Sequence, residues 1–210
     1  MTKLAILGAG GHGRVLADCA QASNLFEEIV FLDDNHPKRD QNLVWPIVGK
    51  TSAWLDYKES HQFALGIGDN QARHTLFTQL TQAGASLPNI IHPSAVISPH
   101  AQLGLGNVVF ANAVINPNAH IGNAVIINTQ VTVEHDCKIE DAVHLSPRVA
   151  LAGTVSVGSF SWLGIGSSVI HQVNIAPFTQ TGAGAVIIND TNAHALYVGV
   201  PAVAKKKLVG

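Results

Sequence analysis

The second half of the chain repeats with a period of six residues, and this repeat limits the possible folds more than any other feature. Every sixth position from 91 to 187 is Ile, Leu or Val at sixteen of seventeen places, and Thr181 is the exception. The side chain four residues after each aliphatic is mostly small or β-branched, and Cys137 is one of these. The register never slips, so no loop interrupts the repeat.

This hexapeptide repeat predicts a parallel β-helix with a triangular cross-section, in which each side is one short strand and each aliphatic side chain points inward. Three hexapeptides form one coil, and coils stack at the interstrand spacing of about 4.8 Å. Residues 18 apart therefore lie above one another. We expect the glycines that follow some of the aliphatics to provide the unusual backbone angles of the corners. These glycines are Gly104, Gly122, Gly158 and Gly164.

The first 85 residues carry the pattern of a small α/β domain instead. The expected elements, in chain order, are a strand over 3–7, a glycine-rich loop over 8–13, a helix over 14–20, a strand over 28–32 and a strand over 63–68. Only one mononucleotide-binding half fits before the repeats begin, which favours a single nucleotide over NAD. We therefore expect a half-Rossmann-like α/β domain over 1–85, followed over 86–210 by the β-helix with a C-terminal tail.

The glycine-rich loop is a candidate phosphate site. Glycines let the backbone approach a phosphate, and the first amides of the following helix attract negative charge. Asp33 and Asp34 end the second strand about 20 residues beyond the loop, where a carboxylate accepts hydrogen bonds from a ribose or a base. The alternative interpretation of the loop is a tight strand-to-helix turn without a ligand.

Composition and charge exclude several functions. Twelve Lys and Arg residues stand against 14 Asp and Glu, and the net charge of −2 argues against a nucleic-acid or anionic-membrane surface. No apolar run approaches the roughly 18 residues of a membrane span or the core of a signal peptide, so we expect a cytoplasmic protein. Cys19 and Cys137 lie far apart, so neither a disulfide nor a metal site is predicted.

The segment 128–137 contains the main catalytic candidate, His135. This histidine falls at an outward position of the repeat between Glu134 and Asp136. A carboxylate bonded to Nδ1 fixes the tautomer of the imidazole and raises the basicity of Nε2. Either neighbour is able to do this, and the alternative is a histidine in a solvated acidic turn.

Together, these segments resemble the sialic-acid O-acetyltransferase/sugar N-acetyltransferase family, which includes the acetyltransferase of the bacillosamine pathway. The segments that carry the resemblance are 8–13, 31–34, 66–70, the repeats and 199–202. The resemblance implies a left-handed β-helix, a homotrimer, acetyl-CoA bound between neighbouring prisms, and a nucleotide-linked 4-amino sugar on the N-terminal domain.

The resemblance also implies roles for single residues. His135 is the expected general base and Asp136 its orienting carboxylate, with Glu134 as the competing orienter. His144 and Gly153 are expected near the acetyl thioester, while Gly182 and Gly184 are expected to line the groove for the pantetheine arm. The residues expected at the nucleotide-linked sugar are Gly10, Gly11, His12, Asp33, Asp34 and Gly68.

The predicted function is acetyl transfer from acetyl-CoA to the 4-amino group of a UDP- or dTDP-linked amino sugar, by direct attack without an acetyl-enzyme. The alternatives are an O-acetyltransferase acting on sialic acid or another sugar, and a non-catalytic nucleotide-binding scaffold. A metal hydratase on the same prism is disfavoured because no two histidines stand five residues apart. Phe110 and Trp162 are candidates for contacts with a neighbouring chain.

Overall fold

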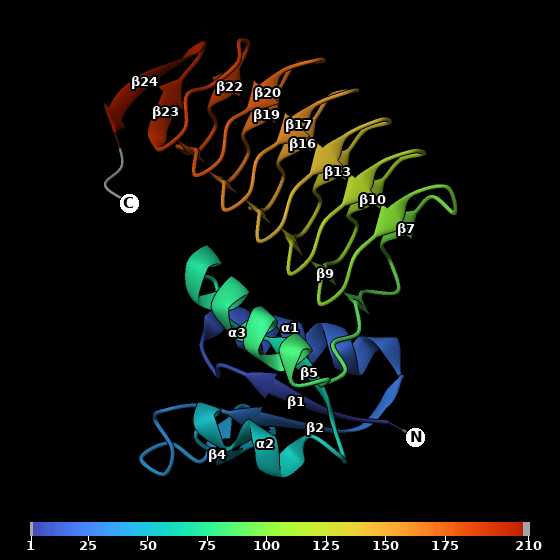
Figure 1. Cartoon of the computed structure of the whole chain (residues 1–210). Coiled ribbons are helices and arrows are strands. Elements are labelled where there is room, and N and C mark those ends of the chain that lie inside the picture. Colours follow the sequence, from blue (N-terminus) through green and yellow to red (C-terminus); the bar gives the residue numbers. More distant parts are fainter. Residues whose placement is uncertain (1, 208–210) are drawn as a thin grey trace. The chain divides into compact units, whose positions relative to one another are not determined.

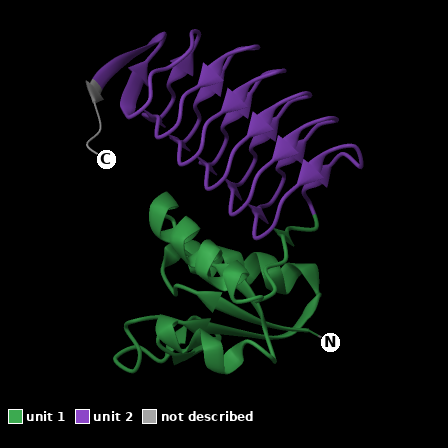
Figure 2. Cartoon of the chain, viewed as in Figure 1, with its two compact units in different colours: residues 1–93 green, residues 94–210 purple. Residues whose placement is uncertain are grey.

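The computed structural model describes residues 2–207 and divides into two compact units, with the division between Pro93 and Ser94 (Figure 2). The sequence places this boundary eight residues earlier, after residue 85. The intervening stretch stays with the first unit because the Ser86 carbonyl accepts a 2.8 Å hydrogen bond from the Phe63 N–H, and Leu87 is buried. Within residues 2–207, no helix has both the length and the apolar character needed to cross a bilayer.

The first unit is built on a five-stranded sheet of order β3-β4-β2-β1-β5, parallel except for the β3–β4 hairpin (Figure 1). Its elements are β1 (Thr2–Leu7), α1 (Gly11–Ser23), β2 (Phe26–Leu32), β3 (Gln41–Asn42), β4 (Trp45–Gly49), the 3₁₀ helix Thr51–Ala53, α2 (Trp54–Tyr57), β5 (Gln62–Leu65), α3 (Asn70–Gln82) and β6 (Ile90–Ile91).

The strands β1, β2 and β5 lie close to where the sequence predicts them, because their buried apolar runs leave little ambiguity. Asp69 begins α3 as its N-cap, and its Oδ1 accepts a 2.8 Å hydrogen bond from the Ala72 N–H. The β3–β4 hairpin is absent from the prediction, since a two-residue strand carries no periodicity.

The second unit is a parallel β-helix, as the repeat predicts (Figure 1). Face 1 comprises β7 (Val96–Ile97), β10 (Val114–Ile115), β13 (Thr132–Val133), β16 (Ala150–Leu151), β19 (Ser168–Val169) and β22 (Val186–Ile187). Face 2 comprises β8 (Gln102–Leu103), β11 (His120–Ile121), β14 (Lys138–Ile139), β17 (Ser156–Val157) and β20 (Asn174–Ile175). Face 3 comprises β9 (Val108–Val109), β12 (Ile126–Ile127), β15 (His144–Leu145), β18 (Trp162–Leu163), β21 (Gln180–Thr181) and the antiparallel hairpin of β23 (Ala195–Gly199) and β24 (Ala202–Lys207).

The coils stack with a constant offset of 18 residues along each face. Val133 pairs with Leu151, for example, and Leu151 in turn pairs with Val169. The inward aliphatic side chains of successive coils are buried on one another and form the interior of the prism. This arrangement fixes which outward side chains are neighbours across coils.

The corners are turned by residues with left-handed backbone angles, three positions after the inward aliphatic. They are Gly106, Asn112, Asn118, Ala124, Gln130, Asp136, Ala142, Arg148, Thr154, Phe160, Gly166, Gln172, Phe178 and Gly184, with φ between 51° and 69°. Most are not glycine, and the composition of this set is too varied to mark it in the sequence.

The expectation that glycines directly after the aliphatics form the left-handed corners was wrong. Gly104, Gly122, Gly158 and Gly164 do not have positive φ values. A Cβ on Gly158 would instead lie 2.6 Å from the nitrogen of Pro177 in the next coil, and the other three glycines are similarly crowded. These glycines therefore allow adjacent coils to approach closely.

The corner geometry predicts that glycine stabilises the protein at an exposed left-handed position. Gln172 has a φ of 63°, and a non-glycine residue there bears strain that outweighs the conformational entropy a glycine loses on folding. We expect Gln172→Gly to raise the free energy of unfolding by about 1 kcal/mol. Chemical denaturation measures this.

The matched control is Gln102→Gly, at an exposed strand position of face 2 whose φ is not positive. Here glycine should lower the free energy of unfolding by about 0.5–1 kcal/mol. Equal effects of the two substitutions would contradict the strain assigned to the corner.

Candidate functional site

The glycines around the predicted nucleotide loop fall into a packed set and an open set. A Cβ on Gly13 or Gly66 would collide with the carbonyl of Gly8, so these residues allow the loop to pack against β1 and β5. A Cβ on Gly10, Gly11 or Gly68 would meet no atom within 4 Å. The three glycines predicted to face the nucleotide-linked sugar are therefore the ones that border open space.

The two aspartates after β2 are bonded to the backbone. Asp33 Oδ2 accepts a 2.7 Å hydrogen bond from the Ala9 N–H, and Asp33 Oδ1 accepts two hydrogen bonds from Asn35. Burial raises the pKa of Asp33, but these hydrogen bonds outweigh it and hold the pKa below its usual value. Asp34 Oδ1 accepts a 3.1 Å hydrogen bond from the Thr51 N–H. Asp33 thus shapes the loop before Gly10 and Gly11, whereas Asp34 holds the backbone that follows β4.

His12 and the buried Arg73 are two titratable side chains near this loop, and only Arg73 carries a charge at neutral pH. Arg73 is 1% exposed; its Nη1 donates to the carbonyls of Ile67 and Gly68, and its Nη2 donates to Asn70 Oδ1. Burial lowers the pKa of Arg73 to about 10, so the guanidinium remains charged at neutral pH. Burial, followed by the Arg73 charge, lowers the pKa of His12 to about 4, which keeps that imidazole neutral.

The sequence did not identify Arg73 as a site residue. Arginine on a short helix is usually exposed, and only its position four residues after the Asp69 cap places it beside the Gly68 loop. The contacts show that it supports the loop that contains Gly68.

His135 and Asp136 form a hydrogen-bonded couple at the corner between faces 1 and 2. His135 Nδ1 lies 2.6 Å from Asp136 Oδ2, while Asp136 Oδ1 accepts a 2.6 Å hydrogen bond from Asn118 Nδ2 in the preceding coil. The Asn118 bond and then the His135 bond lower the pKa of Asp136. Glu134 Oε2 instead accepts from Asn116 Nδ2 at 2.9 Å. Of the two predicted orienters, Asp136 is the one that contacts His135.

Gly153 lies directly against His135, one coil further along. A Cβ on Gly153 would come within 2.6 Å of His135 Nε2 and Cε1. The imidazole, whose side chain is 59% exposed, therefore extends over the empty side-chain position of Gly153. The sequence placed these two residues together correctly, and the structure adds that the glycine makes room for the ring.

His144 lies on face 3, where its ring stacks on the indole of Trp162 at a centroid distance of 5.0 Å. Trp162 Nε1 donates a 2.9 Å hydrogen bond to Ser146 Oγ, which fixes the indole over His144. A groove of about 410 Å³ begins at this indole, and its lining residues are Ser146, Pro147, Trp162, Gly164, Ile165, Gln180, Thr181 and Ala183.

The two glycines predicted for the pantetheine groove flank Ala183, which lines this groove. Gly184 is a left-handed corner residue with open space at its side-chain position. A Cβ on Gly182 would lie 2.8 Å from Val198 Cγ1, so Gly182 is required for packing against β23.

One chain does not bring all the predicted chemical groups together. His135 and Gly153 occupy the corner between faces 1 and 2, whereas His144 and the groove beside Trp162 lie on face 3. In a triangular prism this corner is opposite face 3. The predicted base and the predicted cofactor groove are therefore on opposite sides of the same prism.

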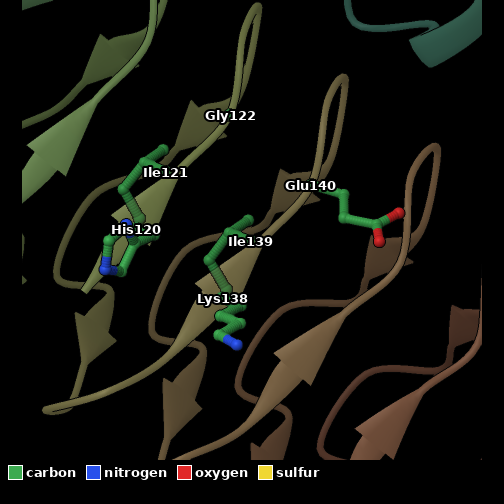
Figure 3. A pocket seen from close by; sticks show the side chains of 6 residues that line it. All are labelled: His120, Ile121, Gly122, Lys138, Ile139 and Glu140. Carbon is green, nitrogen blue, oxygen red and sulfur yellow. The ribbon is translucent and has the colours of Figure 1, made fainter. Parts of the chain in front are cut away.

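A further hollow of about 520 Å³ lies on face 2, over β11 and β14. Figure 3 shows His120 and Lys138 on these adjacent strands, with Glu140 beyond the end of β14. Glu140 Oε2 accepts hydrogen bonds from the backbone and the hydroxyl of Ser159. None of the residues predicted for the site lines this hollow.

Comparison with known proteins gives matches to both halves of the chain. Residues 3–80 match the family described as the PglD N-terminal domain. A UDP-N-acetylbacillosamine N-acetyltransferase from Bacillus subtilis (strain 168) is 35% identical over 107 residues, which cover 50% of this chain. The match spans 49%, or about half, of the length of that protein.

Solved structures of several proteins match nearly the whole chain, among them structures of PglB and PerB. The acetyltransferase domain of PglB from Neisseria gonorrhoeae FA1090 is 36% identical with a TM-score of 0.94, covering 98% of this chain and all of that one. The same domain has a structure in complex with acetyl coenzyme A. PerB from Caulobacter crescentus, in complex with CoA and GDP-perosamine, is 39% identical with a TM-score of 0.90, covering 98% of each chain.

The low pKa of His12 predicts an acid-sensitive contribution to stability. Its pKa is about 4 in the folded protein and 6.5 in an unfolded chain, so the unfolded state binds the proton first. The contribution of His12 to the free energy of unfolding is fully present above pH 6.5. About 3 kcal/mol of it is lost as the pH falls through the range from 6.5 to 4. Urea denaturation at a series of pH values measures it.

In His12→Gln the free energy of unfolding should fall less steeply between pH 7 and pH 4 than in the wild type. His100→Gln, at an exposed position, is the control and should keep the wild-type slope. Parallel curves for wild type and His12→Gln would contradict the prediction.

Proposed function

Because the chain belongs to the sialic-acid O-acetyltransferase/sugar N-acetyltransferase family of left-handed β-helix acyltransferases, we propose that it transfers the acetyl group of acetyl-CoA to the amino group of a nucleotide-linked amino sugar. The observation that carries this proposal is the His135–Asp136 couple, with 2.6 Å between Nδ1 and Oδ2, on the corner of the prism. Relatives that bind acetyl-CoA, or CoA with GDP-perosamine, support the two substrates.

The reaction forms one C–N bond and breaks one C–S bond. The sugar amine attacks the thioester carbonyl, His135 Nε2 takes a proton from the amine, and CoA leaves as the thiolate. Asp136 accepts the Nδ1–H of His135, which leaves Nε2 as the basic nitrogen. Asn118 holds Asp136 from the preceding coil and keeps the carboxylate ionised and aligned.

Transfer is direct, without an acetyl-enzyme. The thiol closest in sequence to His135 belongs to Cys137, which is buried in the prism, and burial raises its pKa. Its Sγ lies 3.2 Å from the Ala152 carbonyl oxygen. A buried thiol with a raised pKa is a poor nucleophile, so the amine itself attacks the thioester.

The N-terminal unit binds the nucleotide-linked sugar in this proposal. Gly10, Gly11 and Gly68 leave space for the ligand, and the first amides of α1 have no side-chain cap. The positive charge of Arg73 and the first amides of α1 favour an anionic ligand at this loop. The named relatives act on or bind UDP- and GDP-linked sugars, so membership of the family leaves the base open.

We also propose a homotrimer with active sites shared between chains. The groove on face 3, beside His144 and Trp162, suits the cofactor, but His135 of the same chain lies on the opposite side of the prism. A neighbouring chain supplies the missing His135 if its corner packs against face 3. Trp162 is 40% exposed and available for this contact, whereas Phe110 is buried at 2% exposure and is not.

Light scattering should give a mass of three times the 22.1 kDa of the chain. Mixtures of His135→Ala chains with chains altered in the groove, such as Trp162→Ala, should regain activity after subunit exchange. Some sites then combine an intact His135 from one chain with an intact groove from its neighbour. A fully active monomer would contradict both the trimer and the shared site.

The direct test is acetyl transfer to a panel of UDP-, dTDP- and GDP-linked amino sugars, followed by thiol release from acetyl-CoA. We expect turnover with at least one of them, and we expect His135→Ala to reduce it by about 10²- to 10⁴-fold, the usual contribution of a general base. His100→Ala, at an exposed position two coils before Asp136 along the same corner, should retain wild-type turnover.

Near-normal turnover by His135→Ala would show that His135 is not the general base. Acetylation of free sialic acid, without turnover of any nucleotide-linked amino sugar, would favour the O-acetyltransferase alternative. A protein that shows no thermal shift with acetyl-CoA would favour the non-catalytic scaffold.

A further inference from the structure

The peptide groups flanking Ala9, at the start of the nucleotide loop, are held by three side chains. The Ala9 N–H donates to Asp33 Oδ2 at 2.7 Å, and the Ala9 carbonyl accepts from Arg39 Nη1 and from Asn42 Nδ2, each at 2.9 Å. We call Asp33, Arg39 and Asn42 the Ala9 clamp. Arg39 and Asn42 come from the β2–β3 connection and from β3, which the sequence did not connect with the loop.

Asn42 is fixed in one orientation. Its side chain is 0% exposed, and its Oδ1 accepts a 2.8 Å hydrogen bond from Arg14 Nε. Because the oxygen faces Arg14, the amide nitrogen faces the Ala9 carbonyl. A buried amide bonded on both sides is costly to rotate, so it holds the carbonyl in one position.

Arg39 provides the second bond to the same carbonyl. Its Nε donates to the Gln41 carbonyl at 3.0 Å, which anchors the guanidinium to the backbone beside β3. The charge of Arg39 also helps to lower the pKa of Asp33. Arg39, which donates to the Ala9 carbonyl, thus helps to keep Asp33 ionised as the acceptor of the Ala9 N–H. A charged donor makes a stronger bond to a carbonyl than a neutral one.

The position of the clamp determines what it controls. Ala9 lies between Gly8, whose φ is 101°, and Gly10, which is the N-cap of α1. A loop rich in glycine has many accessible backbone conformations, and fixing one of them before binding reduces the entropy that the ligand must overcome. Holding the Ala9 carbonyl therefore fixes the direction of the open Gly10–Gly11 segment that follows.

We propose that Arg39 and Asn42 are positioning residues for the nucleotide-linked sugar, acting through the Ala9 carbonyl on the conformation of the loop at Gly10 and Gly11. This inference rests on the proposed function. The clamp lies entirely within the N-terminal unit, whereas the His135–Asp136 couple and the groove on face 3 belong to the second unit. It should therefore affect the affinity for the nucleotide-linked sugar, while the chemical step and the affinity for acetyl-CoA stay the same.

Asn42→Ala and Arg39→Gln each remove one donor to the Ala9 carbonyl. With either variant we expect the KM for the nucleotide-linked amino sugar to rise about tenfold, the effect of one net hydrogen bond, with kcat and the KM for acetyl-CoA within about twofold of wild type. Amide hydrogen exchange at Ala9, whose N–H is bonded to Asp33, should accelerate about tenfold in the ligand-free protein, because the loop opens more easily.

Lys38→Gln is the matched control for charge. Lys38 is exposed and adjacent to Arg39, and Lys38→Gln removes the same charge as Arg39→Gln without altering the bonds to Ala9. Both the KM for the sugar and the exchange at Ala9 should stay at wild-type values. Arg39 is only half-buried, so Arg39→Gln tests the clamp even if Asn42→Ala fails to fold.

Three results would overturn the proposal: unchanged exchange at Ala9 in Arg39→Gln, equal increases in the KM for both substrates, or an increase in the KM for the sugar in Lys38→Gln as large as in Arg39→Gln. If the wild type acetylates no nucleotide-linked amino sugar, the proposed function fails. The exchange measurement still decides then whether the clamp orders the loop.

Discussion

The stacking of inward aliphatic side chains at 18-residue intervals is the interaction on which the second unit depends. Each coil buries its Ile, Leu and Val residues against those of the coils on either side, as in the Val133, Leu151 and Val169 series. Strands of two residues gain little from their own hydrogen bonds, so this packing, together with the ladders between coils, keeps the prism intact. The corners have to be tight enough for each coil to return to its own starting face.

The left-handed corners show how the prism tolerates unfavourable residues. Phe160 and Phe178 have φ values near 60°, which is strained for bulky side chains. Their rings stack at a centroid distance of 4.8 Å, and the ring of His194 continues the stack at 4.5 Å from Phe178. Stacking of this kind contributes about 0.5–1.5 kcal/mol per pair and offsets part of the strain.

The same geometry makes a catalytic couple from adjacent residues. The side chains of His135 and Asp136 converge because Asp136 takes the left-handed corner position, where Asp is better tolerated than most residues. The coil before contributes Asn118, and the coil after contributes the empty position of Gly153. The arrangement therefore uses three consecutive coils, and the 18-residue offset alone aligns them.

The sequence predicted what depends on regular spacing and missed what depends on side-chain direction. The repeat gave the fold and placed Gly153 against His135, because a long unbroken period leaves one register. It left Glu134 and Asp136 as equal candidates, since only the corner angle decides which carboxylate reaches Nδ1. It assigned the corners to the wrong glycines, because a missing side chain serves close packing as well as positive φ. Arg73 went unnoticed, since its hydrogen bonds to Ile67, Gly68 and Asn70 depend on the path of the preceding loop and leave no periodic signal.

The constant 18-residue offset also limits how the length of a prism like this can change. Inserting or deleting one residue between His135 and the C-terminal hairpin would turn later inward aliphatics outward, and even a six-residue change would move each later strand to a different face. The shortest change that keeps both the interior and the identity of the faces is one full coil. Lengthening or shortening by whole coils would move the hairpin end away from His135 or towards it in steps of one interstrand spacing, about 4.8 Å. The distance between His135 and a ligand bound at the hairpin end can therefore change only in steps of one coil.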